Sequence, residues 1–317
     1  MSHHFVEFKD VHFRYPDGSS ALNGASFRIS HGESVGIVGA NGAGKSTLLM
    51  HINGHLLPSS GSIVVGDLQL DKHTRQDIRK KVGLVFQNPD DQLFMPTVFD
   101  DVAFGPLNLG ISADRIAERV EEALDTVGCL KLKDKPPHHL SSGQKSAVAI
   151  ATVIAMRPDI LVMDEPASNL DPKSRRQLIE LLKAFEHTKI VASHDLDLIL
   201  DVCKRCIVIK DGRVAADGPA EAILSNKALL EGNNLELPLS LQKQSINKES
   251  TSMDDMAKLN HLLHHWKEHN DEHAATYREW AAKAEQAGKS ELAETLRGIY
   301  GAAKNLSSLF DEAMKKT

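Results

Sequence analysis

The chain has 317 residues, of which 41% are hydrophobic and 25% charged, with a formal net charge of −6 and three cysteines. This length allows two folded units. The acidic balance argues against a nucleic-acid partner, and three cysteines are too few for a disulfide framework, which favours a cytosolic protein. The first residues lack a charged and then apolar signal segment, and the longest apolar run, Ala147 to Met156, is too short to span a bilayer. Any membrane role is therefore expected to come through partner subunits.

Strand patterns open the chain and lead into a glycine-rich loop. Residues 5–30 alternate apolar and polar side chains, which predicts strands, and residues 34–38 form a short β-branched run typical of a buried strand. Residues 39–47, GANGAGKST, then match the phosphate-binding pattern G-x-x-x-x-G-K-[S/T] in full. A helix is expected to begin near Thr47. This strand, loop and helix predict a site for a nucleoside triphosphate.

The residue types of this loop suit a bound triphosphate. Glycines let the backbone fold around an anion, so that amide groups and the positive helix end face the β- and γ-phosphates. Lys45 adds a mobile charge, and Ser46 can place its hydroxyl on Mg²⁺. The predicted ATP-binding residues of the loop are Gly39, Asn41, Gly42, Ala43, Gly44, Lys45, Ser46 and Thr47.

A second candidate site element is an apolar strand, residues 160–165, that ends in two carboxylates. Asp164 would hold Mg²⁺ through water, and Glu165 would polarise or deprotonate the attacking water. An acidic pair at a strand end is by itself more often a turn into solvent. Its position downstream of Lys45 makes the catalytic interpretation the stronger one.

The sequence LSSGQ at residues 140–144 precedes a helix of small residues, and with this motif the chain resembles the ATP-binding subunits of ABC transporters. The resemblance covers roughly residues 5–235, and the motifs occur in the family's order. It implies an α/β fold: a phosphate-loop, RecA-like ABC ATPase core with an antiparallel β subdomain and a helical subdomain near residues 95–155. In such proteins the signature element of one subunit closes over ATP bound to another, so a second ATPase subunit is implied, either a copy or a sibling.

The resemblance also implies roles for single residues. Ser141, Gly143 and Gln144 would contact ATP from the opposite subunit, and Asp171 lies in the segment that matches the family's dimer-contact loop. The element departs from the commonest pattern at two positions, Ser142 in place of Gly and Ala147 in place of Arg. We therefore expect a working but slow ATPase.

Three further residues match family positions around the nucleotide. Gln87 matches the metal- and membrane-sensing loop and would also approach Mg²⁺, and His194 matches the γ-phosphate switch. His194 follows residues 189–193, a predicted strand that we expect beside the strand of Asp164. Tyr15 matches the aromatic residue that stacks on adenine, although it could equally pack against a sheet.

Residues 85–94, VFQNPDDQLF, resemble a narrower group, the energy-coupling-factor importers, particularly those for cobalt and nickel. That resemblance implies two ATPase subunits at the cytoplasmic face of the membrane. They would sit under a transmembrane coupling protein, and a separate membrane subunit would capture the cargo. Phe94, Met95, Val98 and Phe99 would form apolar surface for docking, or would pack inside the helical subdomain.

The C-terminal part changes character after residue 232. Residues 1–232 are expected to form the ATPase domain, 233–252 a linker, and 253–317 an antiparallel helical hairpin broken at Gly288. Spacings of three and four residues predict one apolar face for each helix. The first face comprises Met256, Leu259, Leu263, Trp266, Asn270, His273, Tyr277, Trp280 and Ala284, and the second Leu292, Leu296, Ile299, Ala303, Leu306 and Phe310.

The hairpin is rich in histidine. His261, His265, His269 and His273 are each four residues apart, so adjacent members could share Ni²⁺, Co²⁺ or Zn²⁺ with nearby carboxylates. The alternative is a solvated polar face. A separate C-x-x-C pair, Cys203 to Cys206, has no second pair and is expected to be structural.

These observations favour an ATP-binding and ATP-hydrolysing subunit that powers an energy-coupling-factor importer for cobalt or nickel ions. A vitamin importer of the same class is the main alternative, because the membrane subunits choose the cargo. A regulatory or repair ATPase that acts without a membrane is the other. A single set of motifs, without fused halves or a long coiled-coil insertion, favours transport.

Overall fold

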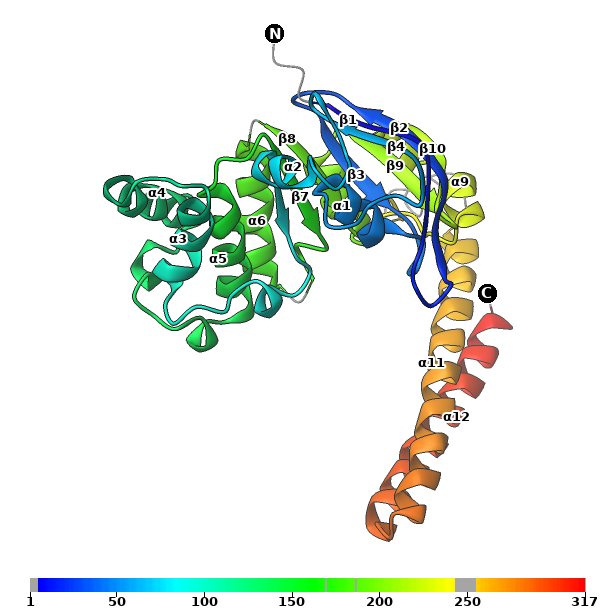
Figure 1. The fold of residues 1–317 in the computed structure, drawn as a ribbon. Helices are drawn as coiled ribbons and strands as arrows, with labels where there is room; N and C mark the ends of the chain where they lie inside the picture. The colour runs from blue at the N-terminus through cyan, green and yellow to red at the C-terminus, as the bar shows by residue number, and fades with distance from the viewer. Residues whose placement is uncertain (1–4, 169, 186, 243–254, 317) are drawn as a thin grey trace. The chain divides into compact units, whose positions relative to one another are not determined.

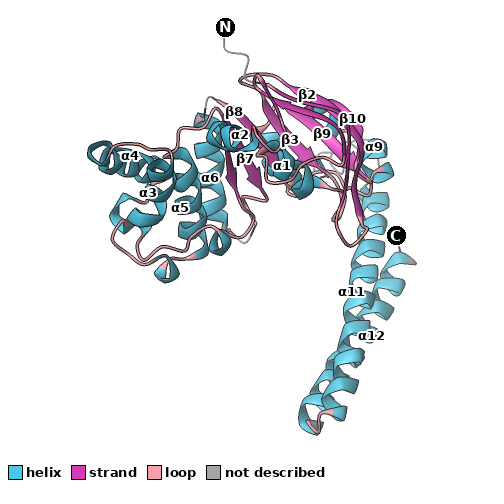
Figure 2. Cartoon of the chain, viewed as in Figure 1, coloured by secondary structure: helices cyan, strands magenta, loops and turns pink. Residues whose placement is uncertain are grey.

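The computed structural model describes residues 5–168, 170–185, 187–242 and 255–316, and the chain divides into two units, Met1–Leu241 and Gln242–Thr317. Each unit is described by itself. The first contains two sheets and the helices around them (Figures 1 and 2), and the second is a helical hairpin. None of the helices in the described ranges is long and apolar enough to cross a membrane.

The central sheet of the first unit has six strands in the order β10-β9-β3-β8-β7-β6. All neighbouring strands run parallel except β10, which pairs antiparallel with β9 at one edge. The three strands β3, β7 and β8 are buried along their whole length because helices or the second sheet cover both faces. The strands are β3 (Ser34–Val38), β6 (Val82–Val85), β7 (Ile160–Asp164), β8 (Thr188–Ala192), β9 (Arg205–Lys210) and β10 (Arg213–Pro219).

The second sheet is antiparallel, in the order β2-β1-β4-β5. Its apolar side chains, among them Phe8 and Phe27, pack in one core cluster with Val35 and Ile37 of β3 and with Leu48 of the first helix. This is the antiparallel β subdomain that the sequence predicts. The strands are β1 (Val6–Arg14), β2 (Ser20–Ile29), β4 (Ser60–Val65) and β5 (Leu68–Gln69).

A second core cluster lies on the other face of the central sheet and joins it to the helices. Successive residues of β7 show the division, since Ile160 and Val162 belong to the first cluster, whereas Leu161 and Met163 belong to the second. Helices α3, α4 and α5 form the predicted helical subdomain (Figure 1). The helices of the first unit are α1 (Lys45–Ile52), α2 (Arg75–Lys81), α3 (Val98–Asn108), α4 (Ala113–Thr126), α5 (Ser142–Ile154), α6 (Pro172–Ala184), α7 (Leu196–Val202), α8 (Ala220–Leu224) and α9 (Lys227–Gly232).

The second unit consists of two helices, α11 (Asp255–Gln286) and α12 (Ser290–Met314), which fold back on each other at Gly288. Gly288 has φ +72°, a conformation that favours glycine and ends the first helix. Asn270, in the middle of the seam, satisfies its amide by donating to the Ala303 carbonyl at 2.6 Å and to Ser307 Oγ at 2.7 Å. The hairpin prediction is therefore correct.

The prediction that each helix has a single inward apolar face needs correction. Leu263, Ala284 and Ala303 are buried between the helices, whereas Trp266 and Ile299 are 46% and 43% exposed, and His273 is exposed rather than buried in the seam. Two helices cannot cover an apolar stripe that is wider than their line of contact. Each predicted face therefore divides into an inward half and an open half.

Close packing at Gly36 of β3 gives a stability prediction. A Cβ atom added there would lie 2.4 Å from Cγ2 of Ile199 on α7, so Gly36→Ala should lower the stability of the first unit by about 1–3 kcal/mol through overpacking. Thermal unfolding followed by circular dichroism tests this. Gly232→Ala, at a helical position with nothing within 4 Å, is the matched control and should leave the transition unchanged or raise it. Equal behaviour of the two variants would contradict the packing argument.

Candidate functional site

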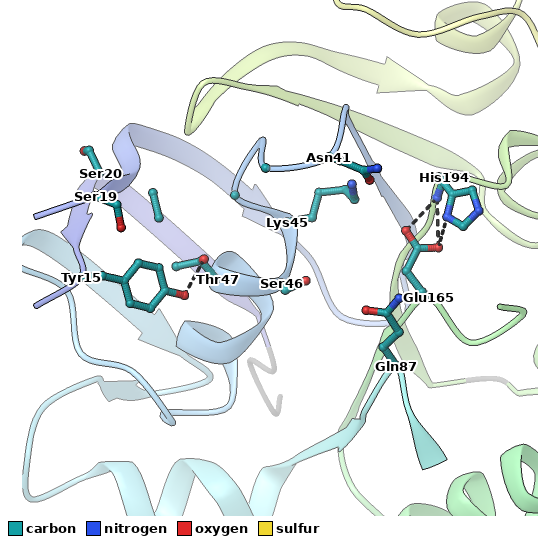
Figure 3. Close-up of a pocket in the computed structure, with 13 residues that line it drawn as sticks. Tyr15, Ser19, Ser20, Asn41, Lys45, Ser46, Thr47, Gln87, Glu165 and His194 are labelled. Carbon is teal, nitrogen blue, oxygen red and sulfur yellow. Dashed lines mark hydrogen bonds and ion pairs between the residues drawn. The ribbon is translucent and has the colours of Figure 1, made fainter. Parts of the chain in front are cut away.

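A cavity of about 610 Å³ lies where several parallel strands of the central sheet end. The phosphate loop follows β3, Gln87 follows β6, Glu165 follows β7 and His194 follows β8, so all four reach the same edge of the sheet. The register places Asp164 of β7 beside Ala192 of β8, as predicted. The cavity is lined by Tyr15, Ser19, Ser20, Ala21, Asn41, Gly42, Gly44, Lys45, Ser46, Thr47, Gln87, Glu165 and His194 (Figure 3).

The glycines of the loop are required by its backbone. Gly44 has φ +104°, and a Cβ atom on it would meet the Ala21 carbonyl at 2.5 Å. A Cβ atom on Gly39 would likewise lie 2.3 Å from the Ile209 carbonyl oxygen. These contacts fix the turn that leads into α1. The loop is thus formed in the protein itself, ready to face an anion with its amide groups.

Lys45 is almost fully buried at the start of α1. Its ammonium donates to the Gly39 carbonyl at 2.8 Å and to the Ala40 carbonyl at 3.3 Å. The charge is therefore held against the loop, in the cavity, by neutral acceptors. An anionic phosphate is a stronger partner for an ammonium than a carbonyl group, so this charge is free to turn toward one.

Asp164 has the features of a cation ligand. It is 8% exposed, and its Oδ1 atom has no hydrogen-bond partner. Burial, with a smaller effect of the Glu165 charge, raises the pKa of this carboxyl, and Ser46 and Lys45 partly oppose that. A buried carboxylate oxygen without a donor is costly unless a cation approaches it. Asp164 does not itself line the cavity, but its side chain is hydrogen-bonded to Ser46, which lines it together with Gln87. The oxygens of these three residues fit the donor set that Mg²⁺ prefers.

Glu165 sits one residue further along, with φ +48°, an uncommon value for a residue with a side chain. Its carboxylate accepts from Ser193 Oγ at 3.0 Å and from the His194 amide at 3.0 Å, and His194 Nδ1 lies 2.8 Å from Oε2. Glu165 is 7% exposed, whereas most of the His194 ring is open to solvent. The strained backbone thus aims a carboxylate into the cavity, where it can accept a proton from water.

Residues beyond the cavity hold the His194 segment in place. Arg175 of α6 forms a bidentate pair with Asp195 at 2.7 and 3.0 Å, and the Asp195 side chain also caps α7 by accepting from Leu198 N. Sequence reasoning missed this pair, as it missed Ser193. No local sequence pattern predicts either contact. The Arg175–Asp195 pair, for example, forms only because α6 and the start of α7 come together in the folded chain.

Tyr15 lies at the opposite end of the cavity from Glu165 (Figure 3). Its hydroxyl forms a 2.9 Å hydrogen bond with Thr47 Oγ1, and its ring stands edge-on to Phe13 at 4.9 Å. The ring is only partly exposed. Ser19, Ser20 and Ala21 line the cavity beside it and were not predicted, since they carry no motif and follow Tyr15 only through the β1–β2 turn.

The signature residues do not line this cavity. Ser141 caps α5 and forms a capping box with Gln144, in which each side chain accepts from the other residue's amide. A Cβ atom on Gly143 would lie 2.4 Å from Ser174 Oγ, and Asp171 caps α6. The predicted ATP-binding residues thus fall into two groups, and one chain brings only the first group together at the cavity. Gly39 and Ala43 belong to the phosphate loop but do not line the cavity.

The Gln87 segment is joined to α5. Lys145 forms a 2.6 Å ion pair with Asp90, and the Gln92 amide donates to the Ala149 carbonyl at 2.8 Å and to Thr152 Oγ1 at 2.7 Å. A movement of the Gln87 segment would therefore carry the helix that begins with the signature.

Most side chains of the predicted histidine site lie outside the part that the structure describes. The side chains of His261, His265 and His269 are not described, and His273 is exposed. Among the residues that are described, no group of three His, Cys, Asp or Glu could hold a metal ion. Cys203 and Cys206 are buried thiols, and burial raises their pKa values to about 11 and about 12, which agrees with a structural role.

Comparison with known proteins identifies the family. Residues 22–168 match the family described as ABC transporter. An ABC transporter ATP-binding protein of Geobacter sulfurreducens is 58% identical over 242 residues, which cover 76% of this chain and 97% of the relative. The chain belongs to the ABC transporter ATP-binding proteins. The energy-coupling factor transporter ATP-binding protein EcfA of Carboxydothermus hydrogenoformans is 48% identical over 237 residues, covering 74% of this chain and 87% of EcfA.

Solved structures of this family share the fold. CbiO1 from Clostridium perfringens, part of the ABC transporter complex cbiONQ, aligns with a TM-score of 0.65 and 39% identity over 73% of this chain and 95% of its own. The dimeric, post-hydrolysis structure of the ATP-binding cassette MJ0796 with ADP and Pi aligns with a TM-score of 0.62 and 30% identity, over 68% of this chain and 98% of its own. Residues 259–317 match a domain of unknown function, DUF8180.

The buried, unpartnered oxygen of Asp164 leads to a second stability prediction. Asp164→Asn should stabilise the protein by about 1 kcal/mol at neutral pH without Mg²⁺ or nucleotide, because it removes the ionised form of a poorly solvated group. Its raised pKa means that ionisation costs more in the folded than in the unfolded state. The gain should therefore be full above the raised pKa and vanish as the pH falls below the ordinary value of 3.8.

Thermal unfolding across this pH range measures the effect. Glu165→Gln is the matched control, since Glu165 already has donors and should gain nothing. A destabilised Asp164→Asn protein at neutral pH would contradict the reading of Asp164 as an unsatisfied cation ligand.

Proposed function

We propose that this chain is the ATP-hydrolysing subunit of an energy-coupling-factor importer, and that it works as a dimer at the cytoplasmic face of the membrane. The family assigns it ATP hydrolysis coupled to transport. The observation that carries the residue-level proposal is the cavity in which Lys45, Glu165 and His194 converge while the signature residues lie elsewhere.

The roles follow from the chemistry of each group. The backbone amides of the loop and the Lys45 ammonium bind the phosphates. Ser46, Asp164 and Gln87 hold Mg²⁺, which supplies charge neutralisation at the phosphate oxygens when bound. Glu165 accepts a proton from the attacking water and orients it.

His194 and Glu165 are linked in the nucleotide-free chain. Because the His194 ring is largely exposed on the cavity side of Glu165, it can turn to donate to a γ-phosphate oxygen and release Oε2 for water. Tyr15 supplies an aromatic face at the far end of the cavity, where we place the adenine base.

A second ATPase subunit completes the site in this proposal. Ser141 and Gly143 lie at the start of α5, outside the cavity of their own chain, and a helix N-terminus is suited to a γ-phosphate. The dimeric MJ0796 structure, with ADP and Pi, supports the pairing of two such cassettes. Asp171, which caps α6 beside Gly143, would lie in the same dimer contact. A copy or a sibling could provide the opposite signature.

The surface beside the Gln87 segment suits a transmembrane coupling protein. Phe94 is 64% exposed and stands edge-on to Phe104, which is 43% exposed, at a centroid distance of 5.1 Å. Asp101 braces the backbone here by accepting from Phe94 N and Met95 N, each at 3.0 Å. Val98, in contrast, is fully buried, and Phe99 packs against the core. Phe94 and Phe104 are thus available for docking, and Phe86 and Leu107 of the same region are also exposed, by 37% and 54%.

For the cargo, we propose cobalt or nickel ions. Support comes from the resemblance of residues 85–94 to that group of importers and from the similarity to cbiO1, part of the cbiONQ complex. Uptake of radioactive Co²⁺, Ni²⁺ and vitamins by cells that carry the chain with its membrane partners tests this. Vitamin uptake without metal uptake would favour the alternative importer, and no dependence of any uptake on the chain would favour a regulatory ATPase. In this proposal the C-terminal histidines bind these ions on the cytosolic side of the membrane.

Glu165→Gln tests the hydrolytic role. Turnover should fall at least about 100-fold, because the attacking water loses its base, while ATP binding is retained. Mg²⁺-dependent phosphate release and equilibrium binding of a fluorescent ATP analogue measure the two quantities. Glu180→Gln, an exposed substitution of the same kind on α6, is the control and should match the wild type. Turnover near wild type in Glu165→Gln would refute the assignment.

Phe94→Asp with Phe104→Asp tests the docking surface. The double variant should keep the ATPase rate of the isolated subunit, but its affinity for the coupling protein should fall at least about tenfold, because two exposed apolar anchors become charged. Co-purification with the tagged coupling protein and its titration measure this. Ala117→Asp, exposed on α4 of the same subdomain, controls for added charge. Undiminished association would move the docking site elsewhere.

A further inference from the structure

The C-terminal hairpin has one open apolar face. Among the side chains that the structure describes on α11 and α12, the large apolar residues that are exposed directly precede residues on the side of the other helix. Trp266, for example, precedes Lys267, which pairs across the seam with Asp311 at 2.7 Å, and Leu292 precedes the fully buried Ala293. These exposed residues are Leu259, Leu262, Trp266 and Trp280 on α11 and Leu292, Ile299, Leu306 and Leu309 on α12, with exposures of 37–56%.

The opposite side of the hairpin carries ion pairs between the two helices, and these pairs show which positions of the two helices lie on the same side. Residues that directly follow an inward position form ion pairs between the helices, Asp271 with Lys304 at 3.5 Å and Glu285 with Arg297 at 2.6 Å. Residues that directly follow an inward-facing residue therefore lie on the same side of the hairpin in both helices. Since successive helical residues turn by about 100°, positions one residue before the seam share the other side. The eight apolar residues therefore lie on one side of the hairpin, together with the exposed polar residues His273 and Lys283, whose ammonium lies 4.7 Å from the centroid of the Trp280 ring.

The size of this surface exceeds what an isolated hairpin needs. Two tryptophans and six aliphatic side chains, each exposed by more than a third, present several hundred Å², which approaches the roughly 800 Å² that each partner buries in a standard interface. Exposed apolar surface of this size, especially when polar residues border it, is typical of a binding site. Acidic and basic residues are nearly balanced in the hairpin, so it lacks the excess of lysine and arginine typical of a helix that binds a membrane surface.

We propose that this face binds the same face of a second copy of the chain, so that two hairpins form a four-helix bundle that holds two ATPase subunits together without nucleotide. An antiparallel hairpin with one apolar face is half of such a bundle, and a two-fold interface needs only one self-complementary surface. The choice of a second copy rests on the proposed ATPase dimer, which would hold two hairpins at an effective concentration on the order of millimolar. The charged face, with its ion pairs, stays in solvent.

Such a bundle would serve the catalytic cycle. The ATPase units must separate after hydrolysis to release ADP, and a permanent contact elsewhere keeps the pair associated while the composite sites open. The next closure is then an event within one dimer and does not depend on protein concentration.

Sedimentation velocity of the full chain without nucleotide tests the proposal. The wild type should be dimeric, and Trp266→Glu with Ile299→Glu should raise the dissociation constant at least about 100-fold, because charges replace two apolar anchors. Ala282→Glu with Ser308→Glu, at exposed positions one residue after the seam, adds the same charge to the other face and should leave the dimer intact. A monomeric wild type, or a dimer unaffected by the first pair, would overturn the proposal.

A cross-link keeps the test independent of any loss of folding. The three native cysteines are buried, so Ile299→Cys introduces the only exposed thiol among the described residues, and a bis-maleimide that can span the interface between two hairpins should yield a covalent dimer. Gly301→Cys, two residues on and one residue after the inward Tyr300, should not cross-link. Equal cross-linking of both would count against a defined face.

The four-helix bundle and the composite ATPase site can be refuted independently of each other. ATP should still dimerise Trp266→Glu, Ile299→Glu in a Glu165→Gln background through the ATPase units. Loss of the nucleotide-free dimer with retention of this ATP-dependent dimer supports the bundle. If the Trp266→Glu, Ile299→Glu, Glu165→Gln protein does not dimerise with ATP while the wild-type dimer without nucleotide persists, the composite ATPase site is refuted and the bundle stands.

Discussion

The alignment of parallel strands in one sheet is the constraint on which the site depends. Because β3, β6, β7 and β8 run in the same direction, the groups that follow them meet at one edge, although the phosphate loop and His194 are more than a hundred residues apart in sequence. The same edge of the sheet also carries two features that are unfavourable by themselves. Glu165 adopts a positive φ and Asp164 keeps an unpartnered oxygen, and both are tolerated because apolar strands on either side fix the backbone.

Much of this arrangement could be predicted from the sequence, and the reason is chemical. The phosphate loop needs glycine wherever its backbone touches another carbonyl, as at Gly39 and Gly44, so the requirement is written into the residues themselves. Glu165 was predicted because it belongs to an acidic pair that ends an apolar run downstream of Lys45, and His194 because it matches the family's γ-phosphate switch and follows a predicted strand. In contrast, the Arg175–Asp195 pair and the contacts of Gln92 with α5 depend on how helices pack. Periodicity gives the face of a helix but not its neighbour.

The hairpin shows the same limit in a different form. A spacing of three and four residues correctly predicted two helices, yet it could not tell which apolar residues pack inward, since Leu263 and Trp266 belong to the same stripe. Only the contacts between α11 and α12 divide that stripe into a seam and an open face. The sequence nevertheless contains more apolar positions than can pack between α11 and α12.

The contacts around α5 connect the separate surfaces of the first unit. This helix begins at the signature, carries Lys145 against Asp90, and receives Gln92 near its middle, while Phe94 emerges from the same segment. A partner that shifts Phe94 would therefore act on the signature through a rigid helix, and closure of the signature on ATP would act on the partner by the same route. Reciprocity of this kind is a thermodynamic necessity once both events move one element. If the hairpins tether two such units, each unit always has an opposite signature within reach, and the state of the coupling surface, not the encounter of subunits, governs closure.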